Sequence, residues 1–279
     1  MEASTSIEPH RGGSGEPLVL IHGFTSSWRN WLPVLPALEE HNDVLAVRLA
    51  GHYDAAAFPD GVEASVESLT DAVERDMDEA DFERARVVGN SLGGWIALEL
   101  AKRGRAVTVV AMSPAGGWNP ASPELRRLER TFKTSHKLAG WLAPHADTLM
   151  RSRLARRVVF SRVAARPERI PPEEAAYRVR ALAGCGAFQA LLATIGRDAP
   201  PRGLDGVDCP VLLIWPTHDR ILPKARYARY FLDALPKAEL QEPHGLGHVP
   251  TFDDPDVIVR SILDFTARHP IDKHGTQRG

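Results

Sequence analysis

The stretch that most constrains the fold is residues 86–103, where a β-branched run is followed by small residues and then by a helical pattern. The run is typical of a buried strand, and the later residues place apolar side chains on one helical face. Between the two, Gly89, Ser91 and Gly93 have the G-x-S-x-G spacing. Only residues without a Cβ leave room for the close approach at a sharp strand-to-helix turn. The stretch therefore predicts a strand, a tight turn with Ser91 at its tip, and a helix.

Ser91 has two interpretations at this position. Backbone N–H groups in the first turn of a helix are unpaired and the helix dipole favours negative charge, so an oxyanion formed on an attacked carbonyl would be stabilised there. Ser91 would then be a nucleophile. A serine at this position is also an ordinary helix N-cap, and the motif alone does not decide between the two.

Short apolar runs alternate with amphipathic patterns along most of the chain. We expect strands at residues 18–21, 44–49, 86–90, 107–112, 210–215 and 238–241. Continuous apolar strands separated by amphipathic helices predict an α/β fold with a mostly parallel sheet and helices on both faces. Functional residues gather at the carboxyl ends of such strands, where His22 and Ser91 both fall.

The alternation stops once, between residues 116 and 208, where the sequence reads as helices only. We therefore expect a core domain over residues 1–115 and 209–279, interrupted by a helical segment over 116–208. Helices are expected from Ser122 onward, and then over the ranges 147–160, 172–183 and 187–195. A helical layer over the sheet would exclude water and shape an apolar pocket, although simple helix packing explains the same pattern. The candidate pocket residues are His22, Trp118, Trp141 and Phe188.

Two further residues in expected strand-end loops complete a set for acyl transfer. Asp219 follows the strand at 210–215, and His248 precedes the last helix. A serine hydroxyl is a poor nucleophile at neutral pH, so a histidine must take its proton and later return it to the leaving group. A buried carboxylate on the other ring nitrogen fixes the tautomer and stabilises the imidazolium. The order Ser91, Asp219, His248 fits one known arrangement of such a triad.

With these residues the sequence resembles the α/β-hydrolases of the esterase and lipase superfamily over nearly its whole length. The matching features, in chain order, are His22-Gly23 after an early strand, Gly-Asn-Ser91-Leu-Gly-Gly, Asp219 with a proline four residues on, and Gly-x-Gly-His248-x-Pro. The chain departs from the pattern at Ala50-Gly51-His52-Tyr53, where members commonly have a Pro-Gly-His-Gly-like turn. The tight turn that carries Ser91 is called the nucleophile elbow in this superfamily. Serine at this position also separates the sequence from epoxide hydrolases and haloalkane dehalogenases, which place aspartate there.

The resemblance implies roles for several residues. The oxyanion hole would use the backbone N–H groups of Phe24 and Leu92. His22 would have the structural role of hydrogen-bonding the loop that carries Phe24, and the helical segment would be a cap domain.

Four other residues compete for the acid and base roles. His244 and His218 lie close to His248 and Asp219 in sequence, and the spacing in the resemblance favours His248 as the base. The acids Asp205 and Asp208 precede their strand, so they would lie at the wrong end of the sheet.

Composition excludes several classes of protein. Hydrophobic residues make up 43% of the chain and charged residues 25%, with a formal charge of −2, which indicates neither disorder nor a nucleic-acid-binding surface. Cys185 and Cys209 fall in no metal-binding spacing and are expected to be free, buried thiols. No signal-peptide pattern is present and no stretch approaches the ~18 apolar residues of a membrane span, so a cytoplasmic location is expected.

The sequence predicts a serine hydrolase that cleaves carboxylic esters of small to medium acyl groups through an acyl-enzyme, without a metal or an organic cofactor. The same triad would also serve a hydrolase of carbon–carbon bonds in ring-cleavage diketones, a lactonase or a cofactor-free perhydrolase. A ligand-binding protein with little turnover is an alternative from another class. A third hypothesis is an interaction protein that binds an anionic partner through arginines of the helical segment. A solvated helix face is the simpler explanation of these arginines. These arginines are Arg126, Arg127, Arg130, Arg151, Arg153, Arg156 and Arg157.

Overall fold

A single seven-stranded sheet forms the centre of the computed structural model, which describes residues 9–271. The strand order is β1-β3-β2-β4-β5-β6-β7; β1 pairs antiparallel with β3, and every other pair is parallel. The strands are β1 His10–Gly13, β2 Glu16–Ile21, β3 Asn42–Ala46, β4 Ala85–Asn90, β5 Ala106–Met112, β6 Val211–Ile214 and β7 Glu239–Gln241. The predicted mostly parallel sheet is confirmed. The sequence does not predict β1, because this half-exposed edge strand has no apolar run.

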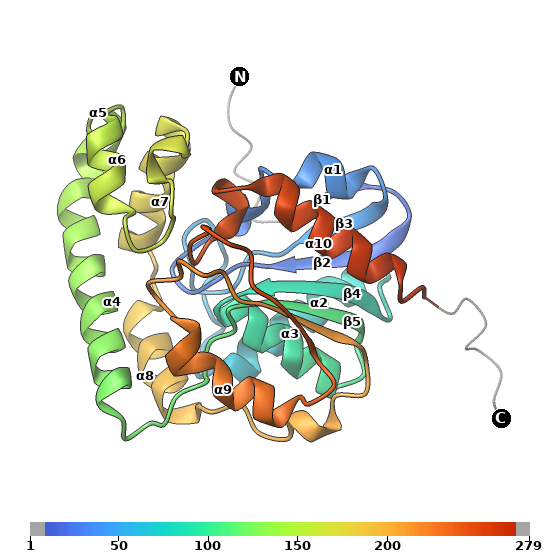
Figure 1. Cartoon of the computed structure of the whole chain (residues 1–279). Helices are drawn as coiled ribbons and strands as arrows, with labels where there is room; N and C mark the ends of the chain where they lie inside the picture. Colours follow the sequence, from blue (N-terminus) through green and yellow to red (C-terminus); the bar gives the residue numbers. More distant parts are fainter. Residues whose placement is uncertain (1–8, 272–279) are drawn as a thin grey trace, which may run out of the picture.

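Helices cover both faces of the sheet (Figure 1). One face is covered by η1 Trp28–Trp31, α1 Leu35–Glu39 and α10 Pro255–Ala267, and the other by α2 Val66–Glu79, α3 Leu92–Lys102 and α9 Lys224–Ala234. Successive side chains of a strand point to opposite faces. In β2, Leu18 and Leu20 join the cluster under α1 and α10, whereas Val19 and Ile21 join the cluster under α2 and α3. Burial on both faces explains why these strands read as apolar throughout.

Between β5 and β6 the chain forms a helical insertion. Its helices are α4 Pro123–Leu142, α5 Ala146–Leu149, α6 Arg153–Val159, α7 Pro172–Ala183 and α8 Phe188–Asp198. Figure 1 shows them standing together along one side of the core. The expectation of one helix over 147–160 is wrong, because the chain turns between α5 and α6. There Ser152 caps α6 by accepting from the Ala155 N–H, and the Arg156 side chain donates to the Met150 carbonyl.

Two other helical segments differ from the sequence expectation. Trp28, Trp31, Leu35 and Leu38 recur at roughly helical spacing, which predicts one irregular helix. In the structure this segment is split into η1 and α1 around Pro33, which has no N–H for a helical hydrogen bond. The sequence does not predict α9, because arginines and tyrosines dilute the apolar stripe in which Tyr227 and Phe231 are buried.

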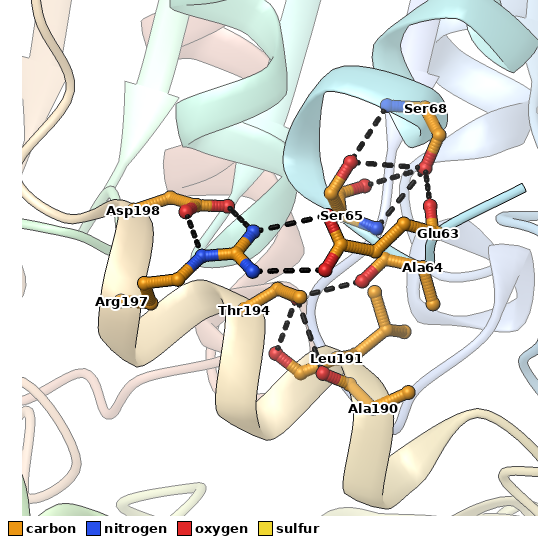
Figure 2. Close-up of polar contacts among 9 residues, drawn as sticks. All are labelled: Glu63, Ala64, Ser65, Ser68, Ala190, Leu191, Thr194, Arg197 and Asp198. Carbon is orange, nitrogen blue, oxygen red and sulfur yellow. Dashed lines mark hydrogen bonds and ion pairs between the residues drawn. The ribbon is translucent and has the colours of Figure 1, made fainter.

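The loop before α2 anchors the last helix of the insertion to the core (Figure 2). Thr194 in α8 donates its hydroxyl to the Ala64 carbonyl at 2.7 Å. One turn later, Arg197 forms two hydrogen bonds to the Glu63 carboxylate, at 2.8 and 3.1 Å. The buried hydroxyl contact is the stronger constraint, because an exposed ion pair contributes only about 0–1 kcal/mol. The end of the insertion is therefore fixed beside Ser65, the N-cap of α2.

No single helix within residues 9–271 has the length and apolar composition of a membrane span. The bent pair α7 and α8 meets both criteria only when taken together, across an angle of 76°.

Candidate active site

Ser91 lies at a sharp turn between β4 and α3, with φ 57° and ψ −115°, a conformation that residues other than glycine rarely adopt. Its N–H donates to the Met112 carbonyl at 2.9 Å, and its own carbonyl accepts from the N–H groups of Gly94 and Ala115 at 2.9 Å each. Such strain persists only where the surroundings hold it in place. These contacts fix the turn and present the Ser91 side chain at the carboxyl edge of the sheet.

Glycines next to Ser91 are required by close backbone contacts. A Cβ on Gly89 would lie 2.1 Å from the Gly93 carbonyl oxygen, and a Cβ on Gly93 would lie 2.1 Å from the carbonyl oxygen of Ile21. A Cβ on Gly23 would lie 3.2 Å from the Cβ of Ser91. The glycines therefore let the end of β2 approach the turn, as the sequence motif predicts.

Asp219 and His248 form a buried pair beside Ser91. His248 Nδ1 lies 2.6 Å from Asp219 Oδ2, and the other oxygen, Oδ1, accepts from the N–H groups of Ile221 and Leu222 at 2.8 and 2.7 Å. With the carboxylate held in this way, the Nδ1–H tautomer is favoured and Nε2 is left free to accept a proton. His248 and Ser91 line the same cavity.

Asp219 is a carboxylate in spite of its burial. Burial alone would raise its pKa, but the charge and hydrogen bond of His248 and the Leu222 N–H outweigh this effect and lower the pKa below 3.8. Asp219 is therefore ionised throughout the neutral range, as a group that stabilises an imidazolium must be.

The competing residues lie elsewhere. His218 and His244 are exposed and face each other at 5.9 Å between ring centroids. Asp205 and Asp208 line a depression at the amino end of β6, away from the residues around Ser91. The structure thus brings Asp219 together with His248 and leaves these four outside the cavity.

The N–H groups expected to form an oxyanion hole belong to residues that line the site. Leu92 is the first residue of α3, where no intrahelical acceptor exists, and Phe24 lies in the turn after β2. Among residues 9–271, neither N–H has a protein acceptor. Phe24, Leu92 and Ser91 line one common cavity.

His22 supports the loop that carries Phe24 and does not line the cavity, so its assignment to the substrate pocket is corrected. The side chain is 1% exposed. Its Nδ1 lies 2.9 Å from the Gly23 carbonyl oxygen, and its Nε2 accepts from the Leu49 N–H at 3.2 Å. Burial, together with neighbouring His52, lowers the pKa of His22 well below 6.5 and keeps the ring neutral.

Stability is expected to fall in mild acid because of His52. Burial lowers the pKa of this histidine to about 4, whereas the unfolded chain binds the proton near the ordinary value of 6.5. Protonation therefore favours unfolding as the pH falls from 6.5 to 4, and one such group costs roughly 2 kcal/mol at pH 5. Urea unfolding at pH 7.5 and pH 5 should show this loss, and a His52→Asn variant should show a smaller one. An equal loss in the wild-type and His52→Asn proteins would contradict the assignment.

Two cavities meet at Ser91. One also contains His248 and the polar residues Ser26, Ser27, Asn30, Asn90 and Arg178. The other is apolar and is lined by Trp118, Leu125, Leu128, Leu192 and Ile195. Phe24, Phe132 and Ile221 line both. The site therefore offers two adjoining spaces at one nucleophile, one with several polar groups among apolar side chains and one that is almost wholly apolar.

The other three residues expected in the substrate pocket, Trp118, Phe188 and Trp141, lie in three different environments. Trp118 lines the apolar cavity, as expected. Phe188 is 2% exposed and stacks on Phe24 at 5.4 Å, so it supports the cavity wall and does not line either cavity. The assignment of Trp141 is wrong, because this side chain is 74% exposed near the end of α4.

Arg178 is a functional candidate that the sequence does not reveal. It lines the cavity that contains His248, with its guanidinium 4.2 Å from the Phe252 ring, and its Nε and Nη2 are buried without a hydrogen-bond partner in the described chain. The acid one turn earlier, Glu174, pairs with Arg29. Burial lowers the pKa of Arg178 to about 10, so it remains charged at neutral pH. A buried cation without a carboxylate partner is a site suited to an anion.

Asn30 and Asn90 add polar atoms to the same cavity. Asn90 donates to the His248 carbonyl at 3.0 Å, which leaves its buried Oδ1 without a partner in the described chain. The Nδ2 of Asn30 is also buried and unpartnered within residues 9–271. Asn90 lies inside the G-x-S-x-G motif, so its place next to Ser91 can be predicted from the sequence. No sequence motif points to Asn30.

Asp253 joins the His248 loop to the insertion. This carboxylate is 1% exposed; its Oδ2 accepts from the N–H groups of Gly247 and Ala165 at 2.7 and 2.9 Å, and its Oδ1 accepts from Arg166 N–H at 2.7 Å. Because Gly247 immediately precedes His248, Asp253 fixes the position of the base.

An Asp253→Asn variant is expected to lower the rate at which Ser91 reacts by roughly 10- to 100-fold, because an amide supplies one acceptor oxygen in place of two and the base is displaced. The unpaired N–H groups should also cost about 1–3 kcal/mol of stability. The matched control is Asp254→Asn, which removes a nearby charge but keeps an oxygen that accepts from the Val257 N–H at the start of α10. That control should change both stability and rate little; equal rates for both variants would contradict the positioning role.

Comparison with known proteins agrees with this geometry. A model of the alpha/beta hydrolase family matches residues 18–261. The chain belongs to the alpha/beta hydrolase family. Among the relatives of this hydrolase, the epoxide hydrolase EphH of Mycobacterium tuberculosis is 32% identical over 198 residues, which are 71% of this chain and 92% of the relative.

Two other proteins similar to this chain have names that refer to reactions other than epoxide hydrolysis. The 2-hydroxy-6-oxo-2,4-heptadienoate hydrolase of Pseudomonas putida is 30% identical over 147 residues, which are 46% of this hydrolase and 53% of the relative. The structure of an esterase from Thermogutta terrifontis superposes with a TM-score of 0.74 at 18% identity, over 94% of this hydrolase and 93% of that chain. The latter shows a shared fold.

Proposed function

We propose that this hydrolase cleaves carboxylic esters through an acyl-enzyme formed on Ser91. The observation that carries the proposal is the buried Asp219–His248 pair, joined at 2.6 Å, whose histidine lines the same cavity as Ser91 at its strained turn. Such a pair supplies the base that a serine hydroxyl needs.

In the proposed reaction, His248 Nε2 takes the Ser91 proton as the serine oxygen attacks the ester carbonyl. The N–H groups of Phe24 and Leu92 stabilise the oxyanion. When the tetrahedral intermediate collapses, the carbon–oxygen bond to the alcohol breaks and His248 returns the proton to the departing oxygen. Water then attacks the acyl-enzyme by the same steps and releases the acid.

The proposal is tested by labelling with a fluorophosphonate and measuring intact mass. One equivalent should bind to the wild-type protein and none to Ser91→Ala. A series of p-nitrophenyl esters from acetate to laurate would then report the length of acyl chain that the apolar cavity accepts. No labelling of the wild-type protein, or labelling that persists in the variant, would refute the proposed nucleophile.

Arg178 favours a second candidate, the cleavage of a carbon–carbon bond in a ring-cleavage keto acid. The heptadienoate hydrolase among the relatives is named for a substrate of this kind. The free N–H groups of Arg178 could bind the substrate carboxylate, while Ser91 attacks the ketone and the leaving carbon takes the proton from His248. Turnover of a vinylogous keto acid far above that of simple esters would support this candidate.

Epoxide hydrolysis is not proposed for this protein, because its expected nucleophile is a serine. Attack of a serine oxygen on an epoxide carbon would give an ether, which lacks the carbonyl that a second water attack requires. An aspartate gives an ester, which can be hydrolysed. Styrene oxide should therefore not be turned over by this protein.

Arg178→Met is expected to raise KM for a carboxylate-bearing substrate by roughly 10- to 100-fold, because a charge-assisted hydrogen bond is lost. The comparison uses mono-p-nitrophenyl glutarate and neutral p-nitrophenyl valerate, and KM for the valerate should change little. Arg180→Met is the matched control, since Arg180 pairs with Asp147 on the surface. Equal effects on the two esters would contradict a carboxylate site at Arg178.

A further inference from the structure

Large apolar side chains are exposed on two helices of the insertion. Trp141 and Leu138 in α4 are 74% and 49% exposed, and Leu154 and Val158 in α6 are 70% and 68% exposed. The neighbouring apolar residues of both helices, among them Ala139 and Ala155, pack in one cluster. In Figure 1 α6 and the C-terminal part of α4 lie in the same part of the insertion. We name the four exposed side chains the apolar patch.

The apolar patch is surrounded by positive charge. Residues 123–162 contain ten lysines and arginines and three acidic residues, whereas the whole chain has a formal charge of −2. Lys133 and Lys137 are exposed and, at spacings of eight and four residues, share the helix face of Trp141. On the α6 side, Arg151 and Arg153 are exposed. No ion pair within the described residues involves any of these four cations.

The combination of exposed apolar and cationic side chains distinguishes between two candidate partners for the apolar patch. A second copy of the chain in a two-fold dimer would place the same cationic residues opposite one another, which is unfavourable. An anionic lipid surface accepts both features, because the cations contact the headgroups while tryptophan and leucine enter the interface. The charge therefore favours a lipid surface.

We propose that the apolar patch and its cationic surroundings bind the surface of an anionic bilayer. The inference does not depend on the proposed reaction, because none of the patch residues lines either cavity at Ser91. Binding of this kind is peripheral and reversible, and it would hold the insertion and the cavities behind it at the lipid boundary.

The test is co-sedimentation of the full chain with vesicles of phosphatidylglycerol and of phosphatidylcholine. Binding to the anionic vesicles should exceed binding to the neutral ones by at least tenfold and should weaken with added salt, because each exposed cation near the surface contributes to the attraction. Trp141→Ser combined with Leu154→Ser, and separately Lys133→Glu combined with Lys137→Glu, should each lower the vesicle partition coefficient by about tenfold or more. The thermal unfolding transition should be unchanged in both variants, which shows that they are folded.

Two control variants separate the patch from general surface effects. Val62→Ser removes an apolar side chain that is 44% exposed outside the insertion, and Lys237→Glu reverses an exposed charge there. Neither should alter vesicle binding. The proposal is overturned if the wild-type protein ignores anionic vesicles, if the patch variants bind as well as wild type, or if sedimentation velocity shows a dimer that the Trp141→Ser variant abolishes.

Discussion

Replacing Ser91 with alanine is expected to lower kcat for any ester that the protein hydrolyses by about 10⁵- to 10⁶-fold, because members of a triad act as a unit and the loss of one removes most of its effect. The residual rate should come from binding and from the N–H groups of Phe24 and Leu92. Stability should change little, since the strained turn is fixed by backbone contacts to Met112, Gly94 and Ala115 that alanine keeps. Steady-state kinetics with a p-nitrophenyl ester measures the rate, and thermal unfolding verifies the fold.

Ser26→Ala is the matched control, because Ser26 lines the same cavity as Ser91. It should keep kcat within a few-fold of wild type and still react with one equivalent of fluorophosphonate. If Ser91→Ala retains a comparable turnover, Ser91 is not the nucleophile and the cavity performs other chemistry.

Replacing Asp219 with asparagine is expected to lower kcat by about 10⁴-fold. An amide keeps the size of the side chain but can donate to His248 Nδ1, and the proton then resides on Nε2, where it blocks proton transfer from Ser91. The 2.6 Å contact in the native protein fixes the opposite tautomer. The rate should rise at high pH if hydroxide replaces the missing base, so kcat/KM is measured between pH 6 and 10.

The competing acids provide controls for this prediction. Asp205→Asn and Asp208→Asn change carboxylates at the amino end of β6 and should leave kcat unaltered. A loss in either of them comparable to that of Asp219→Asn would mean that the assignment of the acid is wrong.

The elbow could be predicted from the sequence because its constraint is local. A turn this tight requires glycine at positions fixed relative to Ser91, and the structure places the Gly93 Cα against the carbonyl of Ile21. The positions of Asp219 and His248 after late strands also follow from the parallel sheet, since the carboxyl ends of such strands meet at one edge.

The surroundings of the site could not be predicted in the same way. Arg178 and Arg180 are two residues apart on α7, yet the first lies in the cavity and the second pairs with Asp147 on the surface. Trp141 is an apolar residue of a segment expected to lie over the sheet as a cap, and nothing local in the sequence reveals that α4 turns its side chain outward. Which helical residue faces a cavity depends on how the insertion packs on the core, and periodicity alone does not specify this.

The carboxylate of Asp253 has a consequence for exchanging modules between related hydrolases. By chain order, Ala165 and Arg166 belong to the insertion, but their N–H groups are bound by the same side chain that holds Gly247 next to the base. A chimaera that replaces residues 116–208 as one block would therefore also remove part of the support for His248. The transplant should succeed when the recipient keeps its own residues 163–166 and only the helices on either side of them are exchanged.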